Sequence, residues 1–557
     1  MNTKKTALIF FIFTFCFTSI CFYSSAQAPE FIWAQSGLGD GFASGAYALD
    51  TDADGNVFMV GSFTDNISFG SITLVDSISS IDLFIVKYDA LGNAIWAKMA
   101  QANSLLDIAY SVTTDAEGNV FVVGQFEYGI AFDSVVLTAD SDCMFIVKYD
   151  ANGNLLWAKC PGTIGGGGQN SASAVSTDIN GNIIVGGAFT GNPNFDAFAL
   201  SNSNSSNDMF LVKYDPSGNV LWAKSSEGSA NDRASALVTD NLGNIVLSGS
   251  FSGASTSFEN STLTNSFSNT NDIFIVKYDA LGNLIWAKRG HGSGDEFALS
   301  IAIDANKNIM IAGSFNGNSF VLGSDTLAEN GAGDMFLAKC DSSGTFLWAK
   351  KAGSIGGDVA YSLISDAIGN IYVAGYFSAP AITFGSNLLM NVGEKDIFIV
   401  KYNEFGNIIW SKSAGGNDSD IACALTADAL GNIYVSGMFC SPDMAIGNTV
   451  LNSVAGCDVF LLKLNSTTGL KELINDTEIN LYPNPSSGKF AVFVQNEKKQ
   501  NEAGLVNVFN LMGELVFQSE FKQLNSLSID ISEKPNGVYF LTINISGQIK
   551  TLKFIKY

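Results

Sequence analysis

The sequence predicts an all-β protein, with a seven-bladed β-propeller followed by a second, small all-β domain. Composition is the first observation behind this prediction: 42 Phe and 56 Gly among 557 residues, with only 9 Pro, are typical of strands joined by tight turns. The second is a sequence repeat that returns seven times without any helical period between its copies. Apolar residues make up 47% of the chain and charged residues 15%, which excludes a disordered or coiled-coil protein.

Three markers recur with one period through residues 29–464, the predicted propeller. The first is tryptophan, whose successive positions differ by 61 to 65 residues: Trp33, Trp96, Trp157, Trp222, Trp286, Trp348 and Trp410. The second is Asp-x-x-Gly-Asn, which begins at Asp52, Asp115, Asp178, Asp240, Asp366 and Asp428 and lacks its Gly in the copy at Asp304. The third is Asp-x-Phe-x-x-Lys, which begins at Asp82, Asp208, Asp272, Asp334, Asp396 and Asp458, with Cys143 in the second copy. A shared period of this length indicates one supersecondary unit per copy.

Each copy divides into four strand-like runs, which in the sixth are residues 360–365, 371–377, 397–402 and 408–412. Asp-x-x-Gly-Asn joins the first two runs and usually also the last two. Its Asp can close a turn on its own backbone, and its Gly accepts the left-handed conformation of a hairpin loop. Four strands in a meander, repeated seven times, describe the blades of a propeller.

The ends of the repeat region predict how the ring closes. A lone tryptophan-type strand at residues 31–35 precedes the first complete copy, and the last copy ends near residue 464 without such a strand. The chain start can therefore complete the last sheet and remove an exposed edge. We predict that residues 31–35 close the seventh blade.

The repeat resembles a known family. Gly357 to Gly375 reads Gly-Asp-x-Ala-x-Ser-x-x-x-Asp-x-x-Gly-Asn-x-Tyr-x-x-Gly, and Asp396 to Lys401 and Ile409-Trp410 follow it. This pattern is similar to the SBBP, or seven-bladed propeller, repeat of bacterial exported proteins, over roughly residues 30–465. The resemblance implies a propeller but no particular activity, because fold alone does not define function.

The N-terminus predicts export. Lys4 and Lys5 precede an apolar run at residues 7–22 and a segment of small residues, so residues 1–26 read as a signal peptide cleaved after Ala26. A lipoprotein signal at Cys21 is a weaker alternative. No later run approaches about 18 consecutive apolar residues, so the sequence predicts no further membrane anchor.

After a polar linker at residues 465–478, residues 479–557 resemble the type A C-terminal sorting domain of the Bacteroidetes type IX secretion system. The resemblance implies a small immunoglobulin-like β-sandwich that the secretion machinery recognises and a sortase-like peptidase removes, which leaves the cargo on surface lipopolysaccharide or free. It rests on four motifs in order, with the signal residues Tyr482, Pro483, Asn484, Pro485, Gly488, Gly513, Gly537, Tyr539, Lys550 and Lys553. The alternative is that these residues only form the turns of an ordinary accessory domain. The predicted destination is the outer cell surface or the medium, reached through the periplasm.

Eight residues before each second-marker Asp lies another series, mostly acidic. Its members are Ser44, Asp107, Asn170, Asp232, Glu296, Asp358 and Asp420. Because the first strand of a blade lies nearest the axis, we expect these side chains to encircle the channel mouth, where they could hold a cation or a basic ligand. The alternative is structural: each side chain accepts backbone N–H groups of its own inter-blade loop, or pairs with the repeated Lys.

Two smaller sets of residues are candidates for metal binding and for a disulfide. Asp50, Asp52 and Asp54 alternate as in a calcium-binding loop, but only the first copy has all three, so calcium is a weak candidate and no other cofactor is predicted. Cys143 and Cys160 flank the turn at residues 150–153, opposite each other or one step off, which suits a cross-strand disulfide. Cys440 and Cys457 bracket one connector and form a weaker pair. Free, buried thiols are the alternative for every cysteine.

Charge and histidine content restrict the function further. The net charge is −24 and the only arginines are Arg233 and Arg289, which excludes nucleic-acid binding. A single histidine, His291, excludes a His-rich metal site.

The sequence thus favours an exported, non-enzymatic propeller that binds an extracellular glycan or protein, or serves as a structural module. We expect binding on the face with the inter-blade loops and long second-to-third-strand connectors such as residues 64–81. The alternative is a secreted polysaccharide-active hydrolase or lyase that uses acidic residues at the channel mouth. In that case Glu296, beside Asp295 and near His291, would be the residue to test.

Overall fold

A computed structural model describes residues 28–41, 44–76, 80–102, 106–163, 169–202, 205–267, 269–465, 479–482, 486–494, 504–510, 515–521, 526–545 and 548–556. The chain forms two compact units, Met1–Ser466 and Thr467–Tyr557, and each is described by itself. The regular elements of the described residues are all β-strands. The predicted signal peptide and most of the predicted linker lie outside the described residues.

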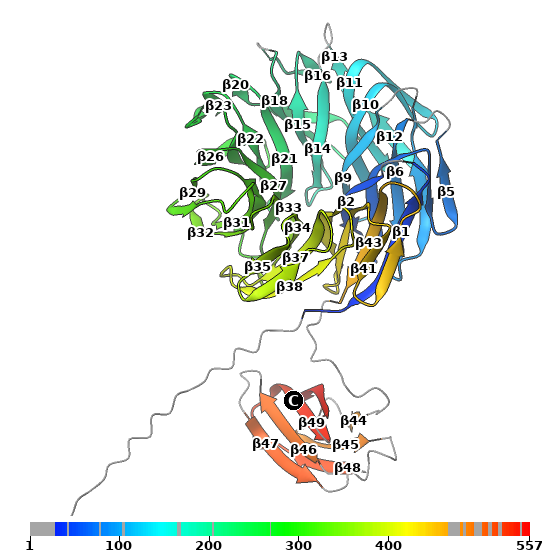
Figure 1. The fold of residues 1–557 in the computed structure, drawn as a ribbon, viewed down its shortest axis with the longest axis vertical. Helices are drawn as coiled ribbons and strands as arrows, with labels where there is room; N and C mark the ends of the chain where they lie inside the picture. Colours follow the sequence, from blue (N-terminus) through cyan, green and yellow to red (C-terminus); the bar gives the residue numbers. More distant parts are fainter. Residues whose placement is uncertain are drawn as a thin grey trace, which may run out of the picture. The chain divides into compact units, whose positions relative to one another are not determined.

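The first unit is a β-propeller (Figure 1). Its described residues contain seven antiparallel units of four strands, and within each unit the strands pair in meander order. The first strand of every unit contacts the first strand of the next, and β39 contacts β2, so the ring is closed. These innermost strands are β2 (Gly45–Thr51), β9 (Ile108–Thr114), β14 (Asn170–Thr177), β21 (Asp232–Thr239), β27 (Glu296–Ile303), β33 (Asp358–Ser365) and β39 (Asp420–Ala427).

The remaining blade strands follow outward from the axis. The second strands are β3 (Val57–Thr64), β10 (Val120–Phe132), β15 (Ile183–Phe189), β22 (Ile245–Phe251), β28 (Ile309–Phe315), β34 (Ile371–Phe377) and β40 (Ile433–Phe439). The third strands are β6 (Ile81–Tyr88), β11 (Val135–Tyr149), β18 (Asp208–Tyr214), β25 (Asp272–Tyr278), β31 (Asp334–Cys340), β37 (Asp396–Tyr402) and β43 (Asp458–Leu464). The fourth strands are β7 (Ala94–Met99), β12 (Leu155–Lys159), β19 (Val220–Ser225), β26 (Leu284–Gly292), β32 (Phe346–Ala352), β38 (Ile408–Ala414) and β1 (Phe31–Gly39).

The N-terminal strand completes the last blade, as its sequence predicts. β1 pairs antiparallel with β43, with Trp33 opposite Lys463 and Gln35 opposite Leu461. The seventh sheet therefore joins segments from the two ends of the repeat region (Figure 1).

The Asp-x-x-Gly-Asn marker forms the predicted hairpin turn. In the sixth blade the carboxylate of Asp366 accepts hydrogen bonds from the backbone N–H and the side-chain amide of Asn370, at 2.8 and 2.7 Å. Gly369 takes a left-handed φ of 84°. Where the fifth copy has lost its Gly, Lys307 adopts the same region with φ 64°.

The long connectors between second and third strands form β-hairpins. In the first blade β4 (Asn66–Phe69) and β5 (Ile72–Val75) lie within the segment 64–81. Alternating apolar residues explain the hairpin: Phe69 packs its ring 5.0 Å from that of Phe84, the Phe of the third marker. The other connector strands are β16 (Pro193–Phe195), β17 (Phe198–Ala199), β23 (Ser255–Phe258), β24 (Ser261–Thr264), β29 (Phe320–Leu322), β30 (Asp325–Leu327), β35 (Ala381–Phe384), β36 (Asn387–Met390), β41 (Asp443–Ile446), β42 (Thr449–Asn452) and the adjoining ends of β10 and β11.

Several connector hairpins also pair with the preceding blade. β4 pairs with β1, β29 with β26, and the far end of β10 with β8 (Gln101–Ala102). β16 and β23 pair in the same way with β13 (Gly162–Thr163) and β20 (Glu227–Gly228). Backbone hydrogen bonds therefore link blades to one another as well as strands within a blade.

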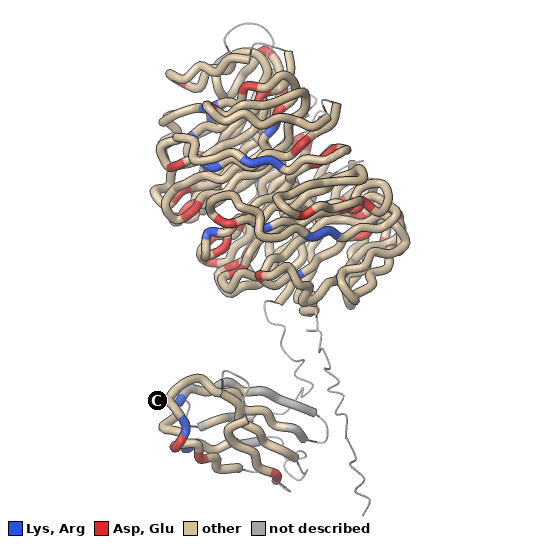
Figure 2. The backbone as a smooth tube through the Cα atoms, turned by 90° about the vertical axis from the view of Figure 1, so that its left-hand side faces the viewer, with Lys and Arg blue, Asp and Glu red and all other residues tan. Residues whose placement is uncertain are grey.

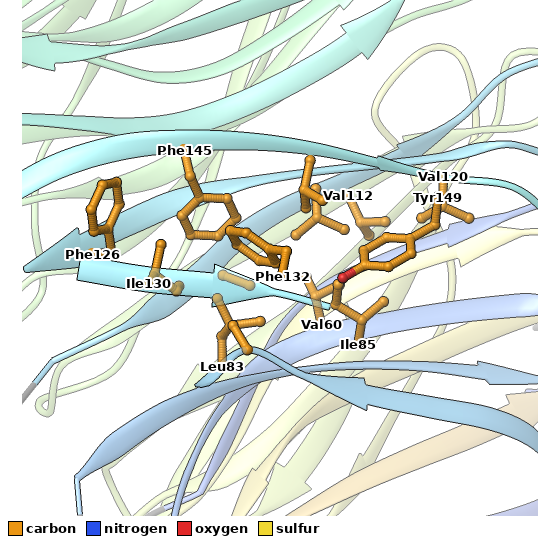
Figure 3. Close-up of a cluster of buried hydrophobic side chains, with 14 of the residues drawn as sticks. Val60, Leu83, Ile85, Val112, Val120, Phe126, Ile130, Phe132, Phe145 and Tyr149 are labelled. Atoms are coloured by element: carbon orange, nitrogen blue, oxygen red, sulfur yellow. The ribbon is translucent and has the colours of Figure 1, made fainter. Parts of the chain in front are cut away.

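The hydrophobic core lies between blades. One cluster combines Val60, Leu83 and Ile85 of the first blade with Phe132 and Tyr149 of the second, all of them nearly fully buried (Figure 3). Further clusters repeat this arrangement around the ring. Each blade therefore depends on its neighbours to bury its apolar faces.

The second unit is a small β-sandwich. Val492 and Ile529 of the first of its two sheets pack with Val506, Leu541 and Ile543 of the second in one buried core. The first sheet holds β44 (Ile479–Tyr482), β45 (Lys489–Val494) and β48 (Ser526–Asp530). The second holds β46 (Gly504–Asn510), β47 (Leu515–Phe521), β49 (Gly537–Ile545) and β50 (Gln548–Lys556).

Acidic positions outnumber basic ones along the chain (Figure 2), as the 53 acidic and 29 basic residues require. The described residues contain no helix with the length and hydropathy needed to cross a bilayer.

Candidate functional site

Two series of polar side chains meet at the seams between neighbouring blades. At each seam the first strand of one blade begins beside the start of the third strand of the preceding blade. The backbone N–H of Glu296, for example, donates to the carbonyl of Asn271 at 2.8 Å, next to Asp272 of the third marker. The resulting seam pairs are Asp82 with Asp107, Cys143 with Asn170, Asp208 with Asp232, Asp272 with Glu296, Asp334 with Asp358, Asp396 with Asp420, and Asp458 with Ser44.

Burial corrects the expected ring at the channel mouth. The side chains of Asp107, Asp232, Glu296, Asp358 and Asp420 are all 0% exposed, and Asn170 and Ser44 are only 3% and 2% exposed. These side chains therefore do not face a solvent-filled channel.

Hydrogen bonds from the inter-blade loops hold the seam acids in place. The backbone N–H of Ser354 donates to Asp358 Oδ2 at 2.7 Å, and that of Gly416 donates to Asp420 Oδ2 at 2.8 Å. This is the structural alternative that the sequence left open: the carboxylates fasten their own inter-blade loops.

The seam between the fourth and fifth blades carries the most strongly perturbed acid. Burial, and then the negative charge of Asp272, raise the pKa of Glu296 to about 9. Burial also raises the pKa of Asp272, although Arg289 acts against this shift, with its Nη1 atom 3.4 Å from Asp272 Oδ2. Arg289 thus gives Asp272 a cationic neighbour in this seam.

Other seams combine the same elements in different ways. Asp232 Oδ2 accepts hydrogen bonds from the hydroxyls of Thr256 and Ser226, at 2.6 and 3.0 Å, yet burial still raises the pKa of Asp232 to about 7. At the seam between the fifth and sixth blades, Lys351 Nζ lies 2.7 Å from Asp334 Oδ2. Burial raises the pKa of Asp358 in this seam to about 6. All these shifts have desolvation as their largest cause.

The cysteine seam corrects the preferred disulfide. Cys143 and Cys160 are free thiols, and the bridge joins Cys440 to Cys457 across the ends of the β41–β42 hairpin. Ile146 pairs with Lys159, which offsets Cys160 by two residues from the position opposite Cys143. The Cys143 thiol interacts with the Cys160 thiol without a covalent bond and lies 3.6 Å from Asn170 Oδ1.

Six of the repeated lysines form ion pairs with turn aspartates and not with the seam acids, contrary to one expected pairing. Lys213 Nζ lies 2.8 Å from Asp178 Oδ2 and donates at 3.0 Å to the carbonyl of Ala280 in the next blade. A Cβ placed on Gly282 of that same turn would lie 2.9 Å from the ring of Trp222. Lysine and tryptophan therefore fasten one blade to the next, and the tryptophans belong to the packing between sheets.

The three acids of the calcium candidate have different surroundings. Asp50 Oδ2 turns to the second blade and accepts the backbone N–H and hydroxyl of Thr114, at 2.7 and 3.0 Å. Asp52 caps its own turn and pairs with Lys87 at 3.2 Å, while Asp54 is exposed. The three carboxylates thus diverge, and the described residues contain no group of three or more potential metal ligands.

His291 lies in a strand and not in a free loop. It is opposite Val321 in the β26–β29 pair, and its Nδ1 atom is 3.5 Å from Ser266 Oγ. Burial and Arg289 lower its pKa. The nearby carboxylate of Asp295 accepts hydrogen bonds from the backbone and side chain of Asn271, at 2.9 and 2.8 Å.

The sorting-signal residues lie in the second unit. Gly488 has a left-handed φ of 99°, and the Tyr539 hydroxyl donates to the carbonyl of Pro535 at 2.6 Å. Gly537 begins β49. Tyr482 is in β44, and Lys550 and Lys553 are in β50. The residues outside the described part of the chain are Pro483, Asn484, Pro485 and Gly513.

One structural series was missed by the sequence reasoning. The second strand of every blade carries a glycine that faces a bulge in the first strand, and a Cβ there would lie 1.8 to 2.0 Å from a backbone oxygen. The series keeps the period of the three markers, so its spacing could have revealed it: Gly61, Gly124, Gly187, Gly249, Gly313, Gly375 and Gly437.

The closed ring and the terminal sandwich define the class of protein, a β-propeller followed by a small β-sandwich. Residues 480–557 match the secretion system C-terminal sorting domain family, which marks proteins that leave through the type IX system for the cell surface or medium. The chain is 27% identical over 442 residues to a WD repeat-containing protein of Acanthamoeba polyphaga mimivirus, covering 64% of this chain and 31% of the viral protein. It is 25% identical over 286 residues to the regulatory protein FlaEY of Caulobacter vibrioides, covering 47% of this chain and 29% of FlaEY. The chain spans less than a third of the length of these curated relatives.

Proposed function

We propose that this protein is a non-enzymatic binding or structural module, built on an SBBP-type propeller and delivered outside the cell by its sorting domain. The match of residues 480–557 to the sorting-domain family is the observation that carries the proposal. The type IX machinery is then its export partner. Removal of the tail by a sortase-like peptidase and attachment to lipopolysaccharide are further parts of the proposal.

The state of the seam acids argues against the hydrolase alternative. A glycosidase needs two carboxyl groups that face one substrate bond from opposite sides. Glu296, Asp358 and Asp420 are 0% exposed, and backbone N–H groups of the inter-blade loops hold Asp358 and Asp420 in place. A sugar could reach them only if two blades separated.

The connector hairpins offer a surface better suited to recognition. Their outward side chains include Val75, Val136, Leu388, Met390 and Val450, each between 55% and 67% exposed. These residues lie on paired strands, so the surface is presented by a rigid scaffold, and the Cys440–Cys457 bridge ties down one hairpin. Mixed apolar and polar hairpins suit a glycan or protein ligand.

Binding without turnover is the expected behaviour of the purified mature protein. Incubated with extracellular glycans and surface proteins of the producing bacterium, it should retain at least one component with a Kd in the micromolar range or tighter, and should release no new reducing ends. The Glu296→Gln variant should bind equally well. Glycan cleavage that this variant loses would contradict the proposal and establish the hydrolase.

Deletion of residues 479–557 is expected to abolish export beyond the outer membrane while leaving the propeller folded. The two units have separate cores, so the propeller does not need the sandwich for its packing. Immunoblots of the periplasm, cell surface and medium measure the distribution, and resistance to limited proteolysis reports folding. Normal amounts of folded, truncated protein outside the cells would contradict the sorting role.

A further inference from the structure

Five seams bury two carboxyl groups each, and in four of them at least one carboxyl oxygen has no ordinary donor. These four seams are Asp208 with Asp232, Asp272 with Glu296, Asp334 with Asp358, and Asp396 with Asp420, and all eight side chains are buried. Within the described residues, no hydrogen bond of regular geometry reaches Asp232 Oδ1, Glu296 Oε1 and Oε2, Asp334 Oδ1, Asp358 Oδ1 or Asp396 Oδ1. A buried anionic oxygen without a donor is costly.

The two carboxyl groups of a seam lie against the same glycine. The N–H of Gly292 points to Asp272 Oδ1 at 3.5 Å, and a Cβ on Gly292 would lie 2.1 Å from Glu296 Oε1. The N–H of Gly228 likewise points to Asp208 Oδ1 at 3.4 Å, and its Cβ would lie 2.2 Å from Asp232 Oδ2. The glycine thus makes room for a second carboxyl group beside the first.

The surrounding charges decide which member of a pair is ionised. Arg289 reaches Asp272, and Lys351 reaches Asp334, so these two acids are the anions of their seams. Asp420 is the anion of its seam because it accepts hydrogen bonds from the N–H groups of Gly416 and Ser441 and from the Ser441 hydroxyl.

We propose that each of these four seams holds a proton: Glu296, Asp358 and Asp396 donate it to Asp272, Asp334 and Asp420, and Asp208 and Asp232 share it between them. The folded ring then keeps protons at pH values at which the unfolded chain has already released them. Raising the pH removes them, places two anions in one buried seam and loosens the contact between blades.

In two other seams an uncharged residue occupies the position that corresponds to Glu296. Asn170 occupies the place of Glu296 and faces Cys143, and Ser44 occupies that place and faces Asp458. Each replaces one acid by a group that cannot ionise near neutral pH, so neither seam has two carboxyl groups. The geometry thus tolerates a neutral group where we place the proton.

The remaining titratable neighbours are few. Besides its partner and Arg289, Glu296 has Asp295 nearby, which also favours its neutral form. Glu227 acts on Asp208, while Tyr376 lies beside Asp358. These groups add negative charge or none at neutral pH, so they favour the retained proton.

The direction of the pH dependence follows from the raised folded pKa values. An acid with a raised folded pKa makes its full contribution to the free energy of unfolding below the pKa that it has in the unfolded chain, about 4. This contribution is lost as the pH rises through the pKa of the folded state. That value is about 6 for Asp358 and Asp396, about 7 for Asp232 and about 9 for Glu296. Turn acids such as Asp150, whose pKa is lowered by hydrogen bonds from Asn154, lose their contribution only near or below pH 4.

The test compares the mature wild type with Glu296→Gln in denaturant unfolding between pH 6 and pH 8. Glutamine keeps the shape and the donor but cannot release a proton. The unfolding equilibrium constant of the wild type should rise about 100-fold relative to the variant over these two pH units, which is tenfold per unit for one retained proton. Glu259→Gln, which removes an exposed glutamate of the fourth blade, should follow the wild type.

Infrared spectroscopy keeps the proposal testable even if Glu296→Gln folds poorly. The native wild type at pH 7 should show the carbonyl stretch of buried carboxylic acids, which should fade as pH rises toward 9. Parallel pH profiles for wild type and a folded Glu296→Gln variant would overturn the proposal. So would a spectrum at pH 7 without protonated carboxyl groups.

Discussion

Removing residues 29–39 from the mature protein is expected to abolish cooperative folding of the propeller. These residues supply β1, whose backbone pairs with β43 from Phe31 to Gly37. The loss of this strand leaves an unpaired edge on β43, uncovers Trp410, which is only 2% exposed, and opens the ring. At about 1 kcal/mol for each backbone hydrogen bond, the pairing alone accounts for about 5 kcal/mol, comparable to the whole stability of many domains.

Thermal unfolding followed by circular dichroism measures this effect. A synthetic peptide of residues 29–39 added to the truncated protein should restore the transition by strand addition. The same peptide with Ala34→Pro is the matched control, since proline removes a ladder donor opposite Leu462, and it should fail. An unchanged melting temperature after truncation would show that β1 does not close the ring.

Gly375→Ala is expected to destabilise the propeller by about 4 kcal/mol, at the upper end for a single methyl group. The added Cβ would lie 1.8 Å from the backbone oxygen of Val359, in the bulge of the neighbouring strand. Backbone cannot rotate away as a side chain can, so the register of β33 and β34 must shift. The seven equivalent glycines predict the same result in every blade.

Gly357→Ala provides the matched control in the same blade. The nearest atoms to its Cβ would be 3.8 Å away, and its φ is not left-handed, so we expect stability within about 1 kcal/mol of wild type. Guanidinium unfolding curves of both variants give the comparison. Similar midpoints for the two variants would contradict the steric explanation of the glycine series.

The repeat made most of the propeller predictable from sequence. Trp222 and its six equivalents recur with one period because each blade needs the same contact with the next, and Asp366 with Gly369 marks a turn that local hydrogen bonds alone specify. The closing strand at residues 31–35 was predictable because the last copy of the repeat lacks a tryptophan-type strand, while an additional strand of this type precedes the first copy. A residue that recurs with the period of the repeat makes the same contact in each blade, so the sequence alone can reveal that such a contact exists.

The role of the seam acids was not predictable in the same way. The sequence placed Glu296 and Asp358 at the start of innermost strands, which suggested exposure at the axis. Only the structure shows that Asp272 and Asp334 of the preceding blades reach the same points and that both groups are buried. Partners separated by 24 residues meet there because neighbouring sheets pack face to face, a relation that no local pattern contains.

The cysteines show the same division between local and tertiary information. The spacing of Cys143 and Cys160 fitted a hairpin, but the register sets them two residues apart across the ladder, while Cys440 and Cys457 meet at the base of a connector hairpin. By itself, the sequence determined that the protein is all-β and exported, with seven repeated units and a C-terminal sorting domain. The tertiary structure alone decided which polar groups are buried together, because burial and charge pairing depend on distances between blades that the chain reaches only when the ring closes.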